Sequence, residues 1–208
     1  MRNRVGMAIG AVLLAATVLA DEPKTPNLDG VVSLYGRFAA LAHGCPVGEN
    51  LILTGAHVTD IFPSELNMPL FGYRFESAYD AGLLIPDAVY SSADLALAHA
   101  DTPLHFWYQI ATEAPKPGDY VWFVGYSWKN RKEVLSRTAT RSKVVRSMAG
   151  SLSYEPAGVP GSSGSCVLNE KGEVVAINVG RLVLEDRSAV GIGVAVWPPW
   201  FEVPKDKE

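Results

Sequence analysis

The chain has 208 residues, 48% of them hydrophobic and 19% charged, so it can bury one sizeable core or two smaller cores that share an interface. Its formal net charge is −4 at pH 7. Nucleic acid is bound chiefly by clustered Lys and Arg side chains that neutralise phosphates, so this acidic balance argues against a nucleic-acid partner.

The first twenty residues have the pattern of a secretory signal peptide. A basic start, MRNR, precedes the uncharged stretch VGMAIGAVLLAATVLA, and small residues stand where a signal peptidase would cut. We expect cleavage after Ala20 and a secreted or periplasmic protein. An uncleaved N-terminal anchor is the alternative, since sixteen apolar residues fall just short of the roughly 17–25 that span a bilayer. Cleavage leaves 16 basic against 22 acidic residues, a formal charge of −6, and no later segment is apolar enough to cross a membrane.

The rest of the chain is expected to be rich in β-structure. Residues 21–30 are polar and contain proline, so we expect a loose N-terminal segment. Short apolar or alternating runs follow, each bounded by Gly, Pro, Asn or Asp, as is typical of strands. These runs cover residues 30–36, 50–56, 73–81, 95–100, 119–126, 133–140, 166–180 and 189–196. Their spacing favours barrels or a sandwich, with helical turns only near 60–66 and 197–202, and the basic run at 129–146 is interpreted as a solvated hairpin.

Two motifs carry residue types suited to catalysis by a serine nucleophile, which needs a base and a carboxylate to orient that base. The base would be His57 in NLILTGAHV, where an apolar strand runs into a turn of small residues. His43, His99 and His105 lack this context and are interpreted as surface or structural histidines. The carboxylate would be Asp94, at the mouth of the alternating strand in SSADLALAHA, unless it only caps a turn there.

The stretch VPGSSGSCVLNEKGEVVAI, residues 159–177, supplies a candidate nucleophile. Gly161 and Gly164 bracket Ser163 and permit backbone conformations in which neighbouring N–H groups converge on one point, as an oxyanion loop requires. The stretch then continues as a strand, a tight turn at 169–172 and a second strand. The loop is therefore mounted on a hairpin, which a flexible linker would lack.

Together these motifs resemble those of the trypsin-like serine peptidases. LTGAHV is similar to the family's histidine motif, ADLALA to its aspartate motif and PGSSGSCVLNEKGEVVAINVG to its serine motif, in the same order and with spacings of 37 and 69 residues. KPGDYVWFVGY and GIGVAV resemble strands of the HtrA/DegP-type members, and the resemblance covers roughly residues 30–197. It implies an all-β fold of two six-stranded antiparallel barrels with the active site in the cleft between them.

The resemblance also assigns roles. Ser163 would be the nucleophile, His57 the general base and then acid, and Asp94 the group that fixes the imidazole tautomer. The N–H groups of Gly161 and Ser163 would form the oxyanion hole. The protease domain would span residues 31–200, followed by a polar tail at 201–208 and no PDZ-like domain. The first barrel would hold the histidine and the aspartate, and the second the serine.

The primary substrate pocket would lie at Ala157 and at the strand residues Asn178, Val179, Gly180 and Arg181. Ala157 stands where members selective for basic residues keep an aspartate, so cleavage after Lys or Arg is not expected. An inward Arg181 would attract an acidic residue, whereas an outward one would leave a small apolar pocket, which is the preferred prediction.

Three further positions depart from the family pattern. Ser162 replaces the aspartate that pairs with a freed N-terminus in zymogen-activated members, so activation by N-terminal insertion is not expected. Gly55 replaces a usual alanine, and Cys166 a usual proline. In the resembled fold Cys45 and Cys166 lie on strands of different barrels, and they would form a disulfide if their Cα atoms lie within about 7 Å. Two separate buried thiols are the alternative.

The predicted function is an exported serine endopeptidase that hydrolyses peptide bonds through a Ser-His-Asp triad and an acyl-enzyme intermediate. The alternative is a catalytically silent binding module on the same fold, and an unrelated β-sandwich adhesin would make all three motif matches accidental. The expected partner is a protein or peptide substrate, and the sequence indicates no particular oligomeric state. No metal or other cofactor is expected, because the four histidines are scattered and two cysteines cannot make a Cys-rich site.

Overall fold

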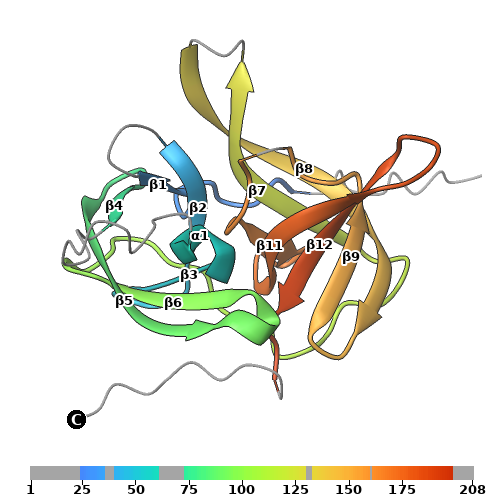
Figure 1. Ribbon diagram of the computed structural model, residues 1–208, viewed down its shortest axis with the longest axis horizontal. Helices are drawn as coiled ribbons and strands as arrows, with labels where there is room; N and C mark the ends of the chain where they lie inside the picture. Colours follow the sequence, from blue (N-terminus) through green and yellow to red (C-terminus); the bar gives the residue numbers. More distant parts are fainter. Residues whose placement is uncertain (1–23, 36–39, 61–72, 130–132, 160, 199–208) are drawn as a thin grey trace, which may run out of the picture.

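The computed structural model describes residues 24–35, 40–60, 73–129, 133–159 and 161–198 (Figure 1). Within these ranges twelve strands form two closed antiparallel barrels of six strands each. Helical structure there is limited to α1 (Ala56–Asp60) and the 3₁₀ turn η2 (Ser91–Ala93). The predicted all-β architecture of two six-stranded barrels is therefore confirmed.

The first barrel is built from the N-terminal half of the chain. Around it run, in this order, β1 (Val32–Tyr35), β2 (Ala40–Pro46), β3 (Leu51–Thr54), β6 (Leu95–Ala100), β5 (Ala81–Tyr90) and β4 (Tyr73–Glu76). Its interior is filled by apolar side chains that alternate along these strands, among them Val32, Leu34, Ile52, Phe75 and Leu84.

The second barrel is built from the C-terminal half. Its strands follow the order β10 (Cys166–Asn169), β11 (Val174–Val183), β12 (Ala189–Ala195), β9 (Ser151–Glu155), β8 (Glu133–Met148) and β7 (Tyr120–Lys129). Its interior contains Val121, Phe123, Leu152, Tyr154 and Val167. The β7–β8 and β11–β12 hairpins extend beyond the barrel (Figure 1), and the basic run forms part of the first of these, as predicted.

A third apolar cluster joins the two barrels. It includes Leu53 and Leu97 from the first barrel and Trp122, Val124 and Ile177 from the second. The shared core means that the two barrels hold each other in a fixed orientation.

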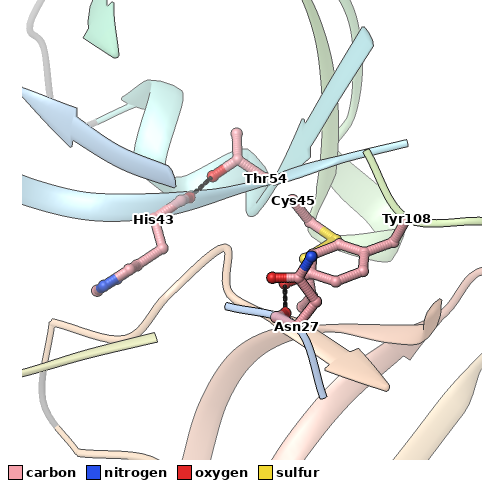
Figure 2. The surroundings of a disulfide bond; sticks show 6 residues. Asn27, His43, Cys45, Thr54 and Tyr108 are labelled. Carbon is pink, nitrogen blue, oxygen red and sulfur yellow. Dashed lines mark hydrogen bonds between the residues drawn. A yellow bond between two sulfur atoms is a disulfide. The ribbon is translucent and has the colours of Figure 1, made fainter. Parts of the chain in front are cut away.

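A disulfide between Cys45 on β2 and Cys166 on β10 lies within this shared core. The two Cα atoms are 5.0 Å apart, and 121 positions separate the cysteines in the sequence. Beside the bond, Tyr108 donates a hydrogen bond from its hydroxyl to the Asn27 carbonyl at 2.6 Å (Figure 2). The predicted disulfide is confirmed, and the N-terminal segment that precedes β1 contacts the core at this point.

Every run predicted to be a strand contains an observed strand, but β2, β5 and β9 were not predicted. β2 contains a glycine and ends in Pro46, and β5 carries Pro86 at a register shift against β6. Proline interrupts a strand pattern in the sequence but is tolerated at a bulge, where no ladder hydrogen bond is needed. The predicted leader (1–20), the polar tail (201–208) and most of both expected helical turns lie outside the described residues. In the part of the chain that the structure covers, no helix is long and apolar enough to span a bilayer.

Candidate active site

His57 projects from α1, directly after the fully buried strand β3. The sequence predicted a turn at a strand end, whereas the structure has a short helix that begins at Ala56. Gly55 lies between the two elements, and a Cβ built there would lie 2.9 Å from Cε1 and 3.1 Å from Nδ1 of the His57 ring. Glycine at this position therefore leaves room for the imidazole in its observed orientation.

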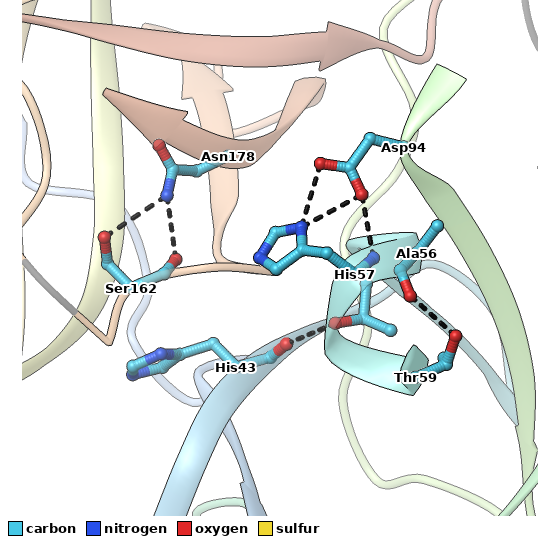
Figure 3. A network of polar contacts seen from close by, with 8 residues as sticks. His43, Ala56, His57, Thr59, Asp94, Ser162 and Asn178 are labelled. Carbon is cyan, nitrogen blue, oxygen red and sulfur yellow. Dashed lines mark hydrogen bonds and ion pairs between the residues drawn. The ribbon is translucent and has the colours of Figure 1, made fainter. Parts of the chain in front are cut away.

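Asp94 binds His57 through both ring and backbone. Nδ1 of His57 lies 2.9 Å from Oδ1 and 2.8 Å from Oδ2 of Asp94, and the His57 backbone N–H donates to Oδ1 at 2.9 Å (Figure 3). A carboxylate can only accept, so Nδ1 carries the proton and Nε2 is left with a free lone pair. This is the tautomer that a general base requires.

The backbone of Asp94 is unusual for a residue with a side chain. Its φ of 52° and ψ of 42° lie in the left-handed region, which costs a non-glycine residue roughly 1–2 kcal/mol, less for Asp because its short side chain can bond locally. Asp94 is the C-cap residue of η2 through its backbone N–H, which donates to the Ser91 carbonyl at 3.2 Å, whereas its side chain bonds to His57. The structure therefore favours the interpretation of Asp94 as the partner of His57 over that of a residue that only caps a turn, and strain of this kind is typical of functional sites.

Two other histidines pair with carboxylates on the outside of the first barrel. Nε2 of His99 lies 3.2 Å from Oδ2 of the exposed Asp87, and Nδ1 of the exposed His105 contacts Asp80. A His–Asp pair is thus not distinctive in this molecule. His57 differs from these two because it lies three residues after Thr54, which packs against Gly164 of the serine loop, residues 161–165.

The serine loop belongs to the second barrel but packs on the middle of β2, at His43, and on the end of β3, at Thr54. The backbone N–H of His43 donates to the Ser163 carbonyl at 2.7 Å. Gly164 lies so close to the His43 carbonyl and the Thr54 hydroxyl that a Cβ there would overlap both, and its φ of 86° also favours glycine. Because Thr54 ends the strand that leads into α1, this packing brings Ser163 to the side of the first barrel that carries His57.

Ser163 is the accessible serine of the loop. Ser162 and Ser165 are 4% and 1% exposed, whereas Ser163 is half-buried. No hydrogen bond joins the Ser163 hydroxyl to His57 among the described residues. Such bonds are commonly long in free enzymes and tighten when substrate binds.

Two backbone donors of the loop have no hydrogen-bond partner within the described part of the chain. The N–H groups of Ser162, Gly164 and Ser165 donate to carbonyl groups of Val159, Asn178 and Ser162, respectively. Those of Gly161 and Ser163 donate to no atom of the described residues. These are the two N–H groups assigned to the oxyanion hole by resemblance.

The Asn178 side chain belongs to β11 of the second barrel and lies against the loop. Its Nδ2 donates to the Ser162 carbonyl at 2.9 Å and to the Ser162 hydroxyl at 3.2 Å (Figure 3). Its Oδ1 accepts from the Tyr154 hydroxyl. Asn178 is 2% exposed and Tyr154 fully buried, and burial raises the pKa of the tyrosine. Asn178 was predicted to line the substrate pocket, and the structure shows that its side chain is hydrogen-bonded to the serine loop at Ser162.

The other residues predicted to form the pocket are more exposed than Asn178. Ala157, Val179 and Gly180 are half-buried, and Arg181 is exposed on the protruding part of β11. The register between β11 and β12 shifts between Asn178 and Gly180. Across the described ranges, no three His, Cys, Asp or Glu side chains gather as metal ligands.

His43 makes contacts that the sequence analysis did not predict. The residue is 5% exposed, with Nδ1 of its ring 2.9 Å from the Gly161 carbonyl and Nε2 accepting from the Tyr126 backbone N–H at 3.0 Å. The predicted disulfide could have indicated these contacts. His43 precedes Cys45 by two residues and Cys166 follows Ser163 by three, so a Cys45–Cys166 bond brings His43 close to the serine loop.

Comparisons with known proteins agree with the two-barrel fold. Residues 42–177 match the family model of the trypsin-like peptidase domain. Similar solved structures include the MamO protease domain from Magnetospirillum magneticum, with 17% identity over 81% of this chain and 93% of that one and a TM-score of 0.64. The serine endoprotease from Yersinia pestis shares 21% identity over 81% of this chain and 59% of that one, with a TM-score of 0.63. Neuropsin, a serine protease of mouse brain, shares 14% identity over 84% and 92%, with a TM-score of 0.64. At these identities the structural likeness shows the fold alone, and a search of curated protein sequences finds no significant match.

Proposed function

Because the chain belongs to the trypsin-like peptidase family, we propose that it is a serine endopeptidase that cleaves proteins or peptides through Ser163, His57 and Asp94. The observation that carries this proposal is the Asp94–His57 pair, which leaves Nε2 of the imidazole free to take a proton beside the one accessible serine of the loop. A trypsin-like fold alone would not require that arrangement.

The proposed reaction follows from these positions. Ser163 Oγ attacks the carbonyl carbon of the scissile peptide while its proton passes to Nε2 of His57, and Asp94 stabilises the imidazolium that results. The unpaired N–H groups of Gly161 and Ser163 hold the oxyanion. The C–N bond then breaks as Nε2 returns the proton to the leaving amine, which leaves an ester on Ser163. Water, deprotonated by the same base, hydrolyses that ester.

The second candidate is a catalytically silent binding module. It is favoured by one observation, that the Ser163 hydroxyl and His57 are not hydrogen-bonded within the described part of the chain. Such a module would have no physical need for an accessible serine in a loop where the N–H groups of Gly161 and Ser163 have no hydrogen-bond partner among the described residues, so we prefer the enzyme.

For the substrate, we propose a preference for small apolar side chains before the cleaved bond. Arg181 is exposed, which matches the outward orientation in the prediction. Tyr154 packs against Gly191 so closely that a Cβ there would overlap the ring, so this part of the barrel is filled with protein atoms. A peptide library with dominant cleavage after Lys, Arg or an acidic residue would contradict this preference.

We also propose that the protein is exported. The buried disulfide supports this, because such bonds persist in the periplasm or outside the cell and are rare in reducing compartments. N-terminal sequencing of protein from the periplasm or medium should find Asp21 as the first residue; retention of Met1 in a membrane fraction would instead identify an anchor.

The activity is tested with a fluorophosphonate probe, which reacts with activated serines. Wild-type protein should be labelled, and Ser163→Ala should abolish labelling and lower kcat by roughly 10⁴–10⁶-fold. Ser165→Ala is the matched control, because its hydroxyl lies in the same loop but is buried with no hydrogen-bond partner among the described residues. Folded wild-type protein that is not labelled would favour the binding module.

A further inference from the structure

His43 belongs to the first barrel, but its imidazole bonds to the second. The ring contacts Gly161 and Tyr126, residues 118 and 83 positions away, through hydrogen bonds of 2.9 and 3.0 Å. Its backbone N–H also reaches the second barrel, at the Ser163 carbonyl, while its own carbonyl accepts from Thr54 at 2.8 Å. The side chain points away from His57 (Figure 3), so it is not a second base for the serine.

The two ring contacts are compatible with one protonation state. The Tyr126 N–H can only donate, so Nε2 must be unprotonated, and the Gly161 carbonyl can only accept, so Nδ1 must carry the hydrogen. The Tyr126 ring stacks on the imidazole with centroids 5.7 Å apart. No charged side chain of the described residues is hydrogen-bonded to the ring. His43 is thus a neutral Nδ1–H imidazole held between a donor and an acceptor.

These contacts immobilise the peptide groups beside the two unpaired donors. The Gly161–Ser162 peptide is held at its carbonyl by His43 and at its N–H by Val159. The Ser163–Gly164 peptide is held at its carbonyl by the His43 backbone and at its N–H by the Asn178 carbonyl. A peptide plane held at both ends cannot rotate without breaking two hydrogen bonds.

Gly161 makes such restraint necessary. Its φ is 89°, and glycine populates other backbone conformations as readily, so nothing in the residue itself keeps its N–H in place. We propose that His43 is a positioning residue for the reaction: its Nδ1–H holds the Gly161 carbonyl and thereby aims the N–H groups of Gly161 and Ser163 at the oxyanion. This role rests on the proposed peptidase function.

A pair of amide substitutions separates the two ring contacts. In His43→Asn the side-chain amide takes the place of Nδ1 and can donate to the Gly161 carbonyl. In His43→Gln the amide takes the place of Nε2 and can only accept from the Tyr126 N–H. We expect His43→Gln to lower kcat by about 10–100-fold with little change in KM, less than the roughly 10²–10³-fold for loss of an oxyanion donor itself. His43→Asn should stay within about threefold of wild type.

The rate of fluorophosphonate labelling and the melting temperature are measured on both variants, with His99→Gln as a control at a half-buried histidine on β6. Slower labelling of the Gln variant than of the Asn variant, at matched melting temperatures, supports the role. Equal labelling of the two, or a loss that follows melting temperature alone, overturns it, because His43 would then only stabilise the fold.

A second measurement does not depend on activity. Nitrogen-15 NMR of the histidines should show His43 with Nδ1 protonated and Nε2 unprotonated at neutral pH. The opposite tautomer or an imidazolium overturns the proposal even in an active enzyme. If the wild-type protein is not labelled, the peptidase proposal fails, and with it the catalytic part of this one; the NMR spectrum then decides only whether His43 holds the loop.

Discussion

The first barrel carries its two candidate reactive side chains on short connections, whereas the second barrel carries a loop that is held almost peptide by peptide. The side chains of His57 and Asp94 are 39% and 36% exposed and bond chiefly to each other. The serine loop is tied to both barrels through His43 and Asn178. A proton-transfer pair needs only that its two side chains are aligned with each other, whereas oxyanion donors must point in a fixed direction. This difference accounts for the larger number of hydrogen bonds that hold the serine loop.

The largest effect should come from changing the first barrel's pair. In Asp94→Asn the amide oxygen can still accept from the His57 backbone N–H, which turns the amide NH₂ toward Nδ1. That arrangement forces the proton onto Nε2, so His57 cannot take one from Ser163. We expect kcat to fall about 10⁴-fold with little change in stability. Asp87→Asn, at the His99 pair, is the matched control and should be silent; similar losses in both variants would contradict a special role for Asp94.

The next effect tests what holds the barrels together. Replacing both cysteines with alanine removes a link that closes a loop of 121 positions, which should lower the free energy of unfolding by up to about 5 kcal/mol. Labelling should also slow, because β2 carries His43 and β10 follows Ser163. Denaturant unfolding of the double variant measures the first change. Alkylation of denatured wild-type protein should add no alkyl group until reductant is present, and uptake without reductant would contradict the bond.

A smaller effect distinguishes His43 from the exposed histidines. Burial lowers the pKa of His43 from the ordinary 6.5 to about 4, although the bond to the Gly161 carbonyl opposes this shift. Between these values the unfolded chain binds a proton that the folded protein does not, so stability falls as the pH drops from about 6.5 to 4. The loss should approach about 3 kcal/mol.

Denaturant unfolding at pH 7 and pH 4.5 gives this dependence. His43→Asn should lose most of it, because the titrating group is gone, while His99→Gln should retain it. Identical pH dependence in wild type and His43→Asn would show that other groups account for the acid sensitivity.

The smallest effect concerns the space beside the base. A Cβ in Gly55→Ala would press on the His57 ring at 2.9 Å, so the imidazole must shift by a few tenths of an ångström. We expect kcat to fall about tenfold, since misplacement by 1 Å costs roughly 10²-fold. Chemical shifts of the His57 ring should change together with the rate. An unchanged rate would show that the His57–Asp94 pair tolerates displacement, and the pair would then differ even more from the firmly held serine loop.

The parts that could be predicted from the sequence are those that short motifs carry. The strand before His57, the glycines around Ser163 and the two cysteines are visible within a few neighbouring residues. β5 was missed because Pro86 interrupts the apolar pattern, and its bulge is stabilised by pairing with β6. His43 contacts Gly161, 118 positions away, and Tyr154 contacts Asn178, 24 positions away. A pattern of neighbouring residues does not predict contacts over such separations.

The close packing of Gly164 against the His43 carbonyl and the Thr54 hydroxyl has a consequence for how the chain folds. The serine loop reaches its final shape only when the second barrel has docked on the first. For the proposed peptidase, a partly folded copy would therefore be a good substrate, with exposed chain, but a poor enzyme. Self-digestion would then require an encounter between such a copy and one that has already finished folding.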